Sequence, residues 1–458
     1  MTYELFFNSV RGASHIKKDI PCEDFGIKAD HGEFKIFAVA DGHGDPNCLR
    51  SSKGSEYICK VAAEELAGFA RSVNEQNWTD KLFIADEFNP MFNQLITSIV
   101  GKWSIAIAED LNNNPLSEEE LAKAPFFAEE FRRGIKPERM YGTTLIAGLQ
   151  AEKYLLLIQQ GDGRCAVFDS NGNVSQPIPW DDRCLANATT SLCDDDVVES
   201  FRYHVIDLEK DPIIACVAGT DGVEDSFPTS MDKTHCYYRK ILKFACENSI
   251  ESLETILPEA LTSLSQTGSA DDVTISGIID IERTKTFLAK FDADNYHIDL
   301  RDELDLVESK IYSIESGGKF EYLKGKYLEA RKDFEQSEKT FSKLSAECEG
   351  LKDLITAHEQ ALPIQEETED LDGNSTSSRK IGELISHIRN MKLSQHYISF
   401  LKQDYNRKAE QLDLAKNHYE QIGNKLRTVE NEFLPYQEKY EDLLEKRKEL
   451  REALNKTI

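Results

Sequence analysis

A heptad pattern in the last third of the chain constrains the fold more than any other feature. Apolar or small residues recur every three or four positions over 398–454, except at Lys408 and Arg447, and a shorter series over 323–355 is broken only at Ser337. Such spacing places a continuous apolar stripe along one face of an α-helix, which is the pattern of a coiled coil. The spacing therefore predicts two long helices, at about 300–361 and 380–456, that pack through these stripes.

The segment between the two series cannot continue a helix. It reads LPIQEETEDLDGNSTSSRK, and its proline, glycine, serines and acidic run predict a loop at 362–379. Residues 300–458 are therefore expected to form a helical hairpin, whose helices could pair within one chain or between two chains. Gly317-Gly318 coincides with a slip in the first heptad frame, and Pro435 is expected to kink the second helix.

The first part of the chain alternates β-rich runs with turn signals. The runs expected to be strands include 34–40, 143–150, 154–160, 164–169, 213–219 and 273–281. Gly161-Asp162-Gly163 and Asn171-Gly172 tolerate positive φ, so 152–173 is interpreted as a hairpin followed by another turn. Helices are expected near 52–72, 90–112 and 236–265. Because strands outnumber helices, an α+β domain is expected at 1–284, followed by a linker at 285–299.

Composition and charge exclude several classes of function. Acidic residues outnumber basic ones by 82 to 54, a net charge of −28, so a nucleic-acid phosphate backbone would repel the chain. No apolar run approaches the roughly 20 residues of a membrane span, and the start lacks the features of a signal peptide. The ten cysteines include no Cys-x-x-Cys pair, so neither a zinc site nor a disulfide framework is indicated. A cytoplasmic protein with reduced thiols is expected.

Acidic residues stand at the ends of three of the expected strands. Asp41-Gly42-His43-Gly44 follows 34–40, Thr220-Asp221-Gly222 follows 213–219, and Asp271-Asp272 precedes the last strand. A strand end beside a glycine presents a carboxylate and neighbouring carbonyl oxygens rigidly, which suits a hard divalent cation. Carboxylates so far apart in the sequence can meet only through folding.

The order of these motifs resembles that of the metal-dependent protein phosphatases, the type 2C serine/threonine phosphatase family. The matching segments are Glu23-Asp24, Asp41-Gly42-His43-Gly44, Gly142-Thr143-Thr144, Gly161-Asp162-Gly163-Arg164, Thr220-Asp221-Gly222 and Asp271-Asp272-Val273-Thr274. The resemblance covers roughly residues 5–282, looks most like bacterial members and leaves the helical region outside. It implies a four-layer α-β-β-α sandwich and a hydrolase that acts on phosphoserine and phosphothreonine with Mn²⁺ or Mg²⁺.

The resemblance also implies a role for each motif residue. Asp41 would bridge two metal ions, Gly42 would offer its carbonyl oxygen to one of them, and Asp221 and Asp271 would hold the other. Two such ions lower the pKa of a bridging water and neutralise the phosphate oxygens, so no covalent enzyme intermediate is needed. His43 matches the general acid that protonates the departing alkoxide.

Further residues come with the resemblance. Glu23 and Asp24 would order metal-bound waters, and Asp162 matches a position that helps some members hold a third metal ion. Many members also place a phosphate-binding arginine four residues before the Glu-Asp pair, where this chain has Asp19. The sequence leaves open which basic residue replaces that arginine, and the candidates are His15, Lys17, Lys18 and Arg50.

Two functions from different classes fit these observations. The first is a cytoplasmic phosphatase of phosphoproteins whose coiled coil regulates it, targets it or binds a partner, such as a cognate Ser/Thr kinase or another coiled-coil protein. The second is a coiled-coil scaffold or sensor with a weak or inactive phosphatase-like domain. The complete set of metal-binding carboxylates favours the enzyme, whereas the missing arginine and the long tail, which could also form a homodimer, favour the scaffold.

Overall fold

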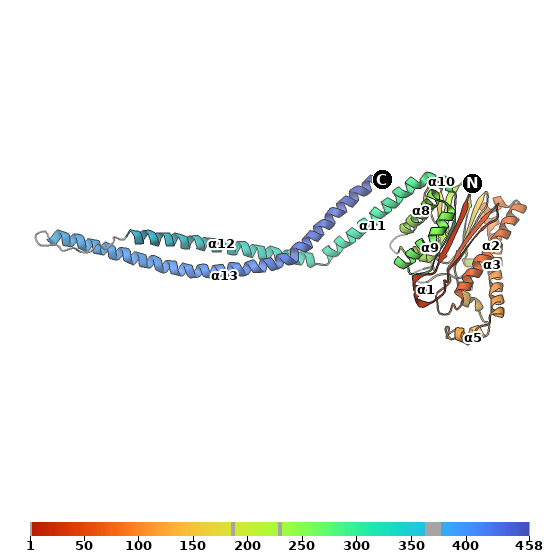
Figure 1. Ribbon diagram of the computed structural model, residues 1–458, viewed down its shortest axis with the longest axis horizontal. Helices are drawn as coiled ribbons and strands as arrows, with labels where there is room; N and C mark the ends of the chain where they lie inside the picture. The colour runs from red at the N-terminus through yellow and green to blue at the C-terminus, as the bar shows by residue number, and fades with distance from the viewer. Residues whose placement is uncertain (1, 185–187, 228–230, 362–376, 458) are drawn as a thin grey trace. The chain divides into compact units, whose positions relative to one another are not determined.

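The computed structural model describes residues 2–184, 188–227, 231–361 and 377–457 (Figure 1). Contacts divide the chain into two compact units, Met1–Asp299 and Leu300–Ile458. In the part of the chain that the structure describes, no helix has an apolar stretch long enough to cross a membrane. All ten cysteines are free thiols, in agreement with the absence of paired cysteine motifs.

The first unit contains two five-stranded antiparallel sheets. One sheet has the strand order β1-β10-β9-β6-β7 and the other has the order β2-β3-β4-β5-β8. The strands are β1 (Glu4–Val10), β2 (Phe25–Asp30), β3 (Lys35–Ala40), β4 (Leu145–Gln150), β5 (Tyr154–Gln160), β6 (Arg164–Asp169), β7 (Val174–Ser175), β8 (Arg202–Asp207), β9 (Ile213–Gly219) and β10 (Val273–Ile279). β4 and β5 are buried at every position, as expected of strands with both faces covered.

Helices cover the outer faces of the sheets (Figure 1). α2 lies on the β2-β3-β4-β5-β8 sheet with α3 beside it, whereas α8 and α9 cover the other sheet. A third apolar cluster fills the space between the sheets. The expected four-layer α-β-β-α sandwich is thus confirmed. The helices of this unit are α1 (Ala13–Lys18), α2 (Ser51–Glu75), η1 (Thr79–Phe83), α3 (Ala85–Asn113), α4 (Glu118–Leu121), α5 (Ala128–Arg132), η2 (Pro137–Tyr141), α6 (Val197–Ser200), α7 (Asp221–Glu224), α8 (Met231–Glu247), α9 (Ile250–Thr267), α10 (Ile281–Thr284) and η3 (Lys285–Phe287).

The expected hairpin between β5 and β6 is wrong. β5 pairs with β4 and β8, whereas β6 pairs with β9 and β7, so the two strands belong to different sheets. The turn at 161–163 carries the chain from one sheet to the other, and Gly161 takes the positive φ of 100° that the reversal needs. A glycine turn serves a crossing as well as a hairpin, and the sequence alone does not distinguish them. The second expected turn is confirmed, because β6 and β7 form a hairpin with Gly172 at φ 73°.

The stretch 236–265, expected as one helix, contains two. α8 ends at Glu247 and α9 begins at Ile250. Ser249 is extended and its side chain accepts a hydrogen bond from the Ser252 amide at 3.1 Å, which caps the second helix. Ser249, which lies within an apolar helical pattern, thus marks the start of a second helix.

The linker expected at 285–299 is also wrong, because these residues are helical and packed. η3 leads directly into α11 (Leu288–Ser316). Phe291 is fully buried, with its ring 5.6 Å from that of Phe168 on β6. The helix also carries Asn295, which hydrogen-bonds to Arg239 of α8. The first unit therefore extends to residue 299.

The second unit is a helical hairpin formed within one chain. α12 (Lys319–Gln360) and α13 (Ser377–Thr457) run antiparallel side by side (Figure 1): Phe320 contacts Tyr440 near one end, and His358 contacts Tyr397 near the other. The helix expected at 300–361 is broken at Gly317-Gly318, where Gly318 has φ 66°. Most of the expected loop, 362–376, lies outside the described residues.

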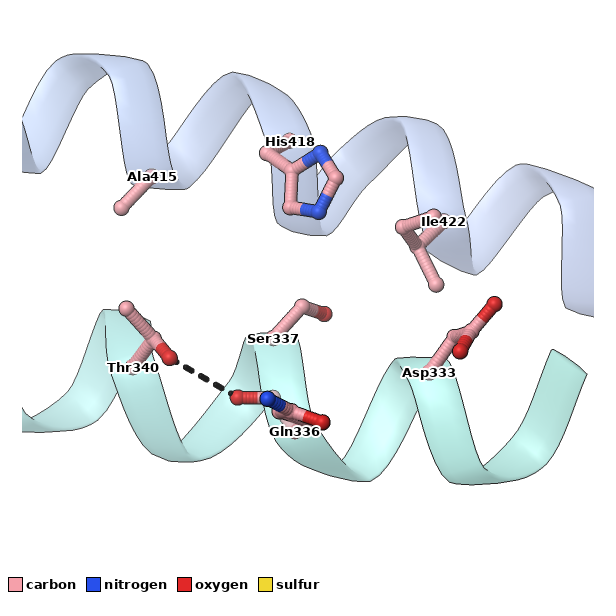
Figure 2. A pocket seen from close by; sticks show the side chains of 7 residues that line it. All are labelled: Asp333, Gln336, Ser337, Thr340, Ala415, His418 and Ile422. Atoms are coloured by element: carbon pink, nitrogen blue, oxygen red, sulfur yellow. Dashed lines mark hydrogen bonds between the residues drawn. The ribbon is translucent and has the colours of Figure 1, made fainter. Parts of the chain in front are cut away.

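The hairpin seam contains a cavity beside Ser337. Tyr419 of α13 stacks between Phe334 and Phe341 of α12, with its ring centroid 5.0 and 5.5 Å from theirs. The small side chains of Ser337 and Ala415 leave a cavity of about 350 Å³ between the helices, toward which His418 points (Figure 2). At Ser337 the apolar seam is therefore interrupted by polar side chains.

Candidate active site

The acidic residues singled out in the sequence meet at one end of the sandwich. Asp41 follows β3, Asp221 begins α7 just after β9, and Asp271 lies shortly before β10. Glu23-Asp24 precedes β2, and Asp162 lies in the crossing between the two sheets. The carboxyl groups are close enough to shift one another's pKa values. Folding thus brings together residues that are up to 248 positions apart (271 − 23).

The Gly142-Thr143-Thr144 motif holds the main chain of Asp41. The Thr143 hydroxyl and the Thr144 amide both donate to the Asp41 carbonyl oxygen, each at 2.8 Å. The Asp41 amide donates to the Thr144 hydroxyl at 3.0 Å. Both threonines are buried, so these bonds are protected from exchange with water. The motif therefore fixes the position from which the Asp41 side chain extends.

Two glycines allow the acidic loops to approach one another closely. A Cβ atom on Gly42 would lie 2.6 Å from the Glu23 carbonyl oxygen, to which the Gly42 amide donates at 3.1 Å. A Cβ atom on Gly222 would lie 2.0 Å from the Asp272 carbonyl oxygen. Neither position has room for a side chain, which explains why glycine follows both Asp41 and Asp221.

Asp272 was not among the expected metal ligands, but its carboxylate holds several groups in place at this end of the molecule. Its carboxylate accepts hydrogen bonds from the Gly12 amide at 2.5 Å and the Glu23 amide at 2.6 Å, and it contacts His15 Nδ1 at 2.9 Å. His15 Nε2 lies 3.7 Å from a Glu23 carboxylate oxygen and 3.8 Å from one of Asp271. The side chain of Asp271 is 54% exposed and that of Asp272 is 2% exposed. The pair therefore divides into one accessible and one structural carboxylate.

Electrostatics make the centre unfavourable without a counter-charge. Burial raises the pKa of Asp24 with the help of Asp272, and burial raises that of Asp41 with the help of Asp221. Burial also raises the pKa of Asp221 to about 7, and this side chain hydrogen-bonds to that of Asp41. In the described part of the chain, no three His, Cys, Asp or Glu side chains are already spaced as a metal cage. The donor set nevertheless fits a cation, because oxygen donors that repel one another are what a hard cation stabilises.

His43 lies beside the acidic centre with a defined hydrogen-bond partner. Its Nε2 is 2.7 Å from the hydroxyl of Ser191, and its amide donates to the Gly142 carbonyl oxygen at 3.0 Å. Burial lowers the pKa of His43, whereas Asp162 and Asp194 act in the opposite direction. Ser191 was missed in the sequence, and no motif marks it.

The four basic candidates for binding phosphate lie in different surroundings. His15 is buried against the acidic centre, while Lys17 and Lys18 are exposed on α1. Arg50 is not brought to the centre: its guanidinium is buried and donates to Asp110 at 2.9 Å and to Glu120 at 3.0 Å. It thereby ties the start of α2 to α3 and α4.

Comparison with known proteins assigns the family. The model of the protein phosphatase 2C family matches residues 11–261, more than half of the chain. The chain therefore belongs to the protein phosphatase 2C family, and its first unit is a protein serine/threonine phosphatase domain. No curated protein matches the chain.

Solved structures similar to the chain include several bacterial phosphatases. A bacterial serine phosphatase is 17% identical, over 61% of this chain and 98% of its own, with a TM-score of 0.37. The serine/threonine phosphatase Stp1 from Staphylococcus aureus is 16% identical, over 61% and 96%, with a TM-score of 0.38. The Mycobacterium tuberculosis phosphatase PstP/Ppp is 15% identical, over 61% and 99%, with a TM-score of 0.35.

Proposed function

We propose that this chain is a metal-dependent phosphatase that hydrolyses phosphoserine and phosphothreonine esters with Mn²⁺ or Mg²⁺. The observation that carries the proposal is the crowding of the buried Asp24 with the half-buried Asp41 and Asp221, whose carboxyl groups all have raised pKa values. Carboxyl groups placed this close together cost stability in the absence of a cation, and an inactive scaffold would gain nothing in return. A catalytic metal site requires such a cluster of carboxylate ligands.

The residues divide the work as follows. Asp41, the Gly42 carbonyl oxygen, Asp221 and Asp271 would hold the metal ions, and Asp162, whose charge acts on Asp221, would take part in a third, weaker site. Bound Mn²⁺ or Mg²⁺ supplies an activated water and neutralises charge on the phosphate. Glu23 and Asp24 orient water molecules around the centre.

His43 donates the proton that the departing serine or threonine oxygen needs. Its Nε2 is held at 2.7 Å from the Ser191 hydroxyl, which keeps the ring at a fixed orientation beside Asp162. The protonated imidazolium is the form that donates, and the nearby carboxylates of Asp162 and Asp194 favour this form against the burial that lowers the pKa of His43.

His15 takes the place of the arginine that Asp19 replaces. Of the four basic candidates, it alone is buried against Glu23, Asp271 and Asp272. Arg50 is held by Asp110 and Glu120, and the two lysines are exposed on α1. His15 therefore orients the surrounding carboxylates and faces the phosphate from their side.

Removal of metal tests the proposal. We expect the full chain, stripped with a chelator, to lose hydrolysis of p-nitrophenyl phosphate and to regain it with Mn²⁺. The same Mn²⁺ addition should raise the melting temperature, because a ligand at 100 times its Kd stabilises by about 2.7 kcal/mol. The assays are a phosphatase time course and a thermal melt. Neither turnover nor divalent-cation binding by calorimetry is expected of the scaffold, so a negative result in both would favour that alternative.

We also propose that the hairpin targets the phosphatase domain to a partner protein, such as a kinase or another coiled-coil protein. The support is a row of exposed large apolar side chains on α13, outside its ring contacts with α12: Leu393, Phe400 and Leu414. Exposed apolar side chains along one helix are commonly covered by a partner. Pairing with a second copy of the chain is the other way to cover them.

Truncation distinguishes targeting from regulation. Because α11 packs on the first unit up to residue 299, the cut belongs after that residue and not at 284. If the hairpin only targets, residues 1–299 should hydrolyse p-nitrophenyl phosphate within about twofold of the full chain. A change of tenfold or more in kcat/KM would show that the hairpin regulates the domain. Sedimentation of the full chain separates a monomer from a homodimer.

A further inference from the structure

A cavity of about 330 Å³ lies beside the acidic centre, on the side of the sheet crossing. It is lined by Arg164, Gln176, Ile178, Pro179, Trp180 and Met231, among others. Its volume lies at the lower end of the range for ligand pockets in proteins and is enough for one large side chain. None of the motifs that mark the metal centre explains the apolar part of this lining.

The cavity shares a wall with the catalytic centre. Gly163 lines it, and a Cβ atom on Gly163 would lie 2.8 Å from the Gly219 carbonyl oxygen and 3.6 Å from the Thr220 Cα atom. Gly219 and Thr220 immediately precede Asp221. On its other side Gly163 is bonded to Asp162, whose charge acts on both Asp221 and His43. Residues next to a phosphorylated residue held at the carboxylates would thus lie within reach of this cavity.

The walls of the cavity are held in place by bonds that do not depend on a ligand. Gln159, which is buried, donates to the carbonyl oxygens of Gly163 at 2.7 Å and Gly161 at 3.2 Å. Arg202 donates to the Pro179 carbonyl oxygen at 3.0 Å and also to that of Gly161. The two walls are therefore joined, and a preformed site needs little ordering when it is filled.

Trp180 is the exposed anchor of the cavity. Its indole is 41% exposed, although a tryptophan is normally more deeply buried. The Arg164 guanidinium lies 3.6 Å from the ring centroid and is held by two hydrogen bonds to Glu224 of α7. Glu224 neutralises Arg164, so the cavity offers the Trp180 ring and the side chains of Ile178, Pro179 and Met231, beside the polar side chains of Gln159 and Gln176.

We propose that this cavity is a specificity subsite that binds a large apolar or aromatic side chain located next to the phosphorylated residue of the protein substrate. Trp180 is the residue that determines this preference, and Arg164 positions its ring. The inference rests on the proposed phosphatase activity, because the substrate reaches the cavity only when its phosphate lies at the carboxylates.

The test compares three substrates of the full chain with Mn²⁺: p-nitrophenyl phosphate, a phosphothreonine peptide flanked by phenylalanine and leucine, and the same peptide flanked by glycine and serine. We expect kcat/KM to be about tenfold higher for the apolar peptide, chiefly through KM. Trp180→Ala should reduce that ratio to near one and leave p-nitrophenyl phosphate turnover unchanged. Trp180→Phe should keep most of the preference. Phe126→Ala, which removes an aromatic ring that is 90% exposed elsewhere, is the matched control and should change nothing.

The outcomes separate the two claims. Equal kcat/KM for the two peptides with wild-type protein, or a preference that survives in Trp180→Ala, would overturn the subsite and leave the phosphatase assignment intact. No hydrolysis of p-nitrophenyl phosphate by the wild-type protein would overturn the proposed function and the subsite with it. The wild-type comparison needs no variant, so a variant that fails to fold does not block the test.

Discussion

Asp41→Asn should reduce Mn²⁺-dependent phosphatase activity by at least about a thousandfold, the largest effect we expect from any single substitution. The amide keeps the shape of the side chain and the main-chain bonds from Thr143 and Thr144. It removes the negative charge that Asp41 would supply to the proposed metal ions. Asp221→Asn should have a similar effect. The measurement is kcat for p-nitrophenyl phosphate over a range of Mn²⁺ concentrations, and full activity in either variant would refute the metal assignment.

The same variants should be more stable than the wild type when no metal is present. A carboxylic acid whose folded pKa is raised stabilises the fold below its unfolded pKa of about 4, and that contribution is lost as the pH rises through the folded value. Because burial raises the pKa of Asp221 to about 7, the wild type carries this penalty at pH 8 and Asp221→Asn does not. Thermal melts with a chelator should show a higher melting temperature for the variant, and Mn²⁺ should reverse the order.

Asp19→Asn provides the matched control. Asp19 is an exposed acid that ends α1 in the left-handed conformation, with φ 56°, which asparagine also adopts readily. We expect its activity, Mn²⁺ dependence and melting temperature to match those of the wild type. Loss of activity in this control would mean that activity depends on the net negative charge of the domain and not on the particular carboxylates of the acidic centre.

Arg50→Ala should destabilise the first unit by about 3 kcal/mol without changing catalysis by the molecules that remain folded. Removing the Arg50 side chain leaves the Asp110 carboxylate, which is 3% exposed, without its guanidinium partner. The loss of one partner of a buried ion pair costs about 3–5 kcal/mol. Lys53 still donates to Asp110 at 2.6 Å, which favours the lower end of that range. Denaturant unfolding measures the loss.

The contribution of the Asp110 carboxylate should also depend on pH in a defined direction. Burial opposes ionisation of Asp110, but hydrogen bonds from Lys53 and Tyr141 outweigh it and hold the pKa of Asp110 well below its usual value. The stabilisation is therefore complete above the unfolded pKa of about 4 and declines as the pH falls below it. Lys53→Ala, at a half-exposed partner of the same carboxylate, should cost about 1 kcal/mol or less. A raised KM with unchanged stability in Arg50→Ala would instead make Arg50 a phosphate ligand.

Local sequence patterns predicted the strands well and their pairing poorly. β5, β6 and β9 begin and end where the apolar runs do, since a run buried on both faces is bounded by polar or glycine residues. The partner of each strand depends on contacts distant in sequence, and the glycines at 161–163 fit a crossing as well as a hairpin. The linker expected at 285–299 was wrong for a related reason: Phe291 is buried by Phe168, which lies more than a hundred residues earlier.

For the candidate site, the motifs indicated which acidic residues would lie close together. They did not indicate which of these residues is accessible and which is held by hydrogen bonds to its neighbours. Asp271 and Asp272 are adjacent and chemically alike, and only the fold leaves one accessible and binds the other to Gly12, Glu23 and His15. Ser191 lies in no motif, so its contact with His43 could not be foreseen. Arg50 was a reasonable phosphate ligand until its acidic partners on α3 and α4 were known.

The division of the acidic residues between the sheets has a mechanical consequence. Asp41 and Asp24 extend from one sheet, whereas Asp221, Asp271 and Asp272 extend from the other. The apolar layer between the sheets sets the distance between them. Because apolar contacts are non-directional, they resist the sliding of one sheet along the other only weakly. Directional bonds across this end, from Thr220 to Asp24 at 2.8 Å and from the Glu23 amide to Asp272, oppose that sliding. A cation held by both Asp41 and Asp221 would connect the two sheets. Its binding would therefore fix the alignment of one sheet against the other.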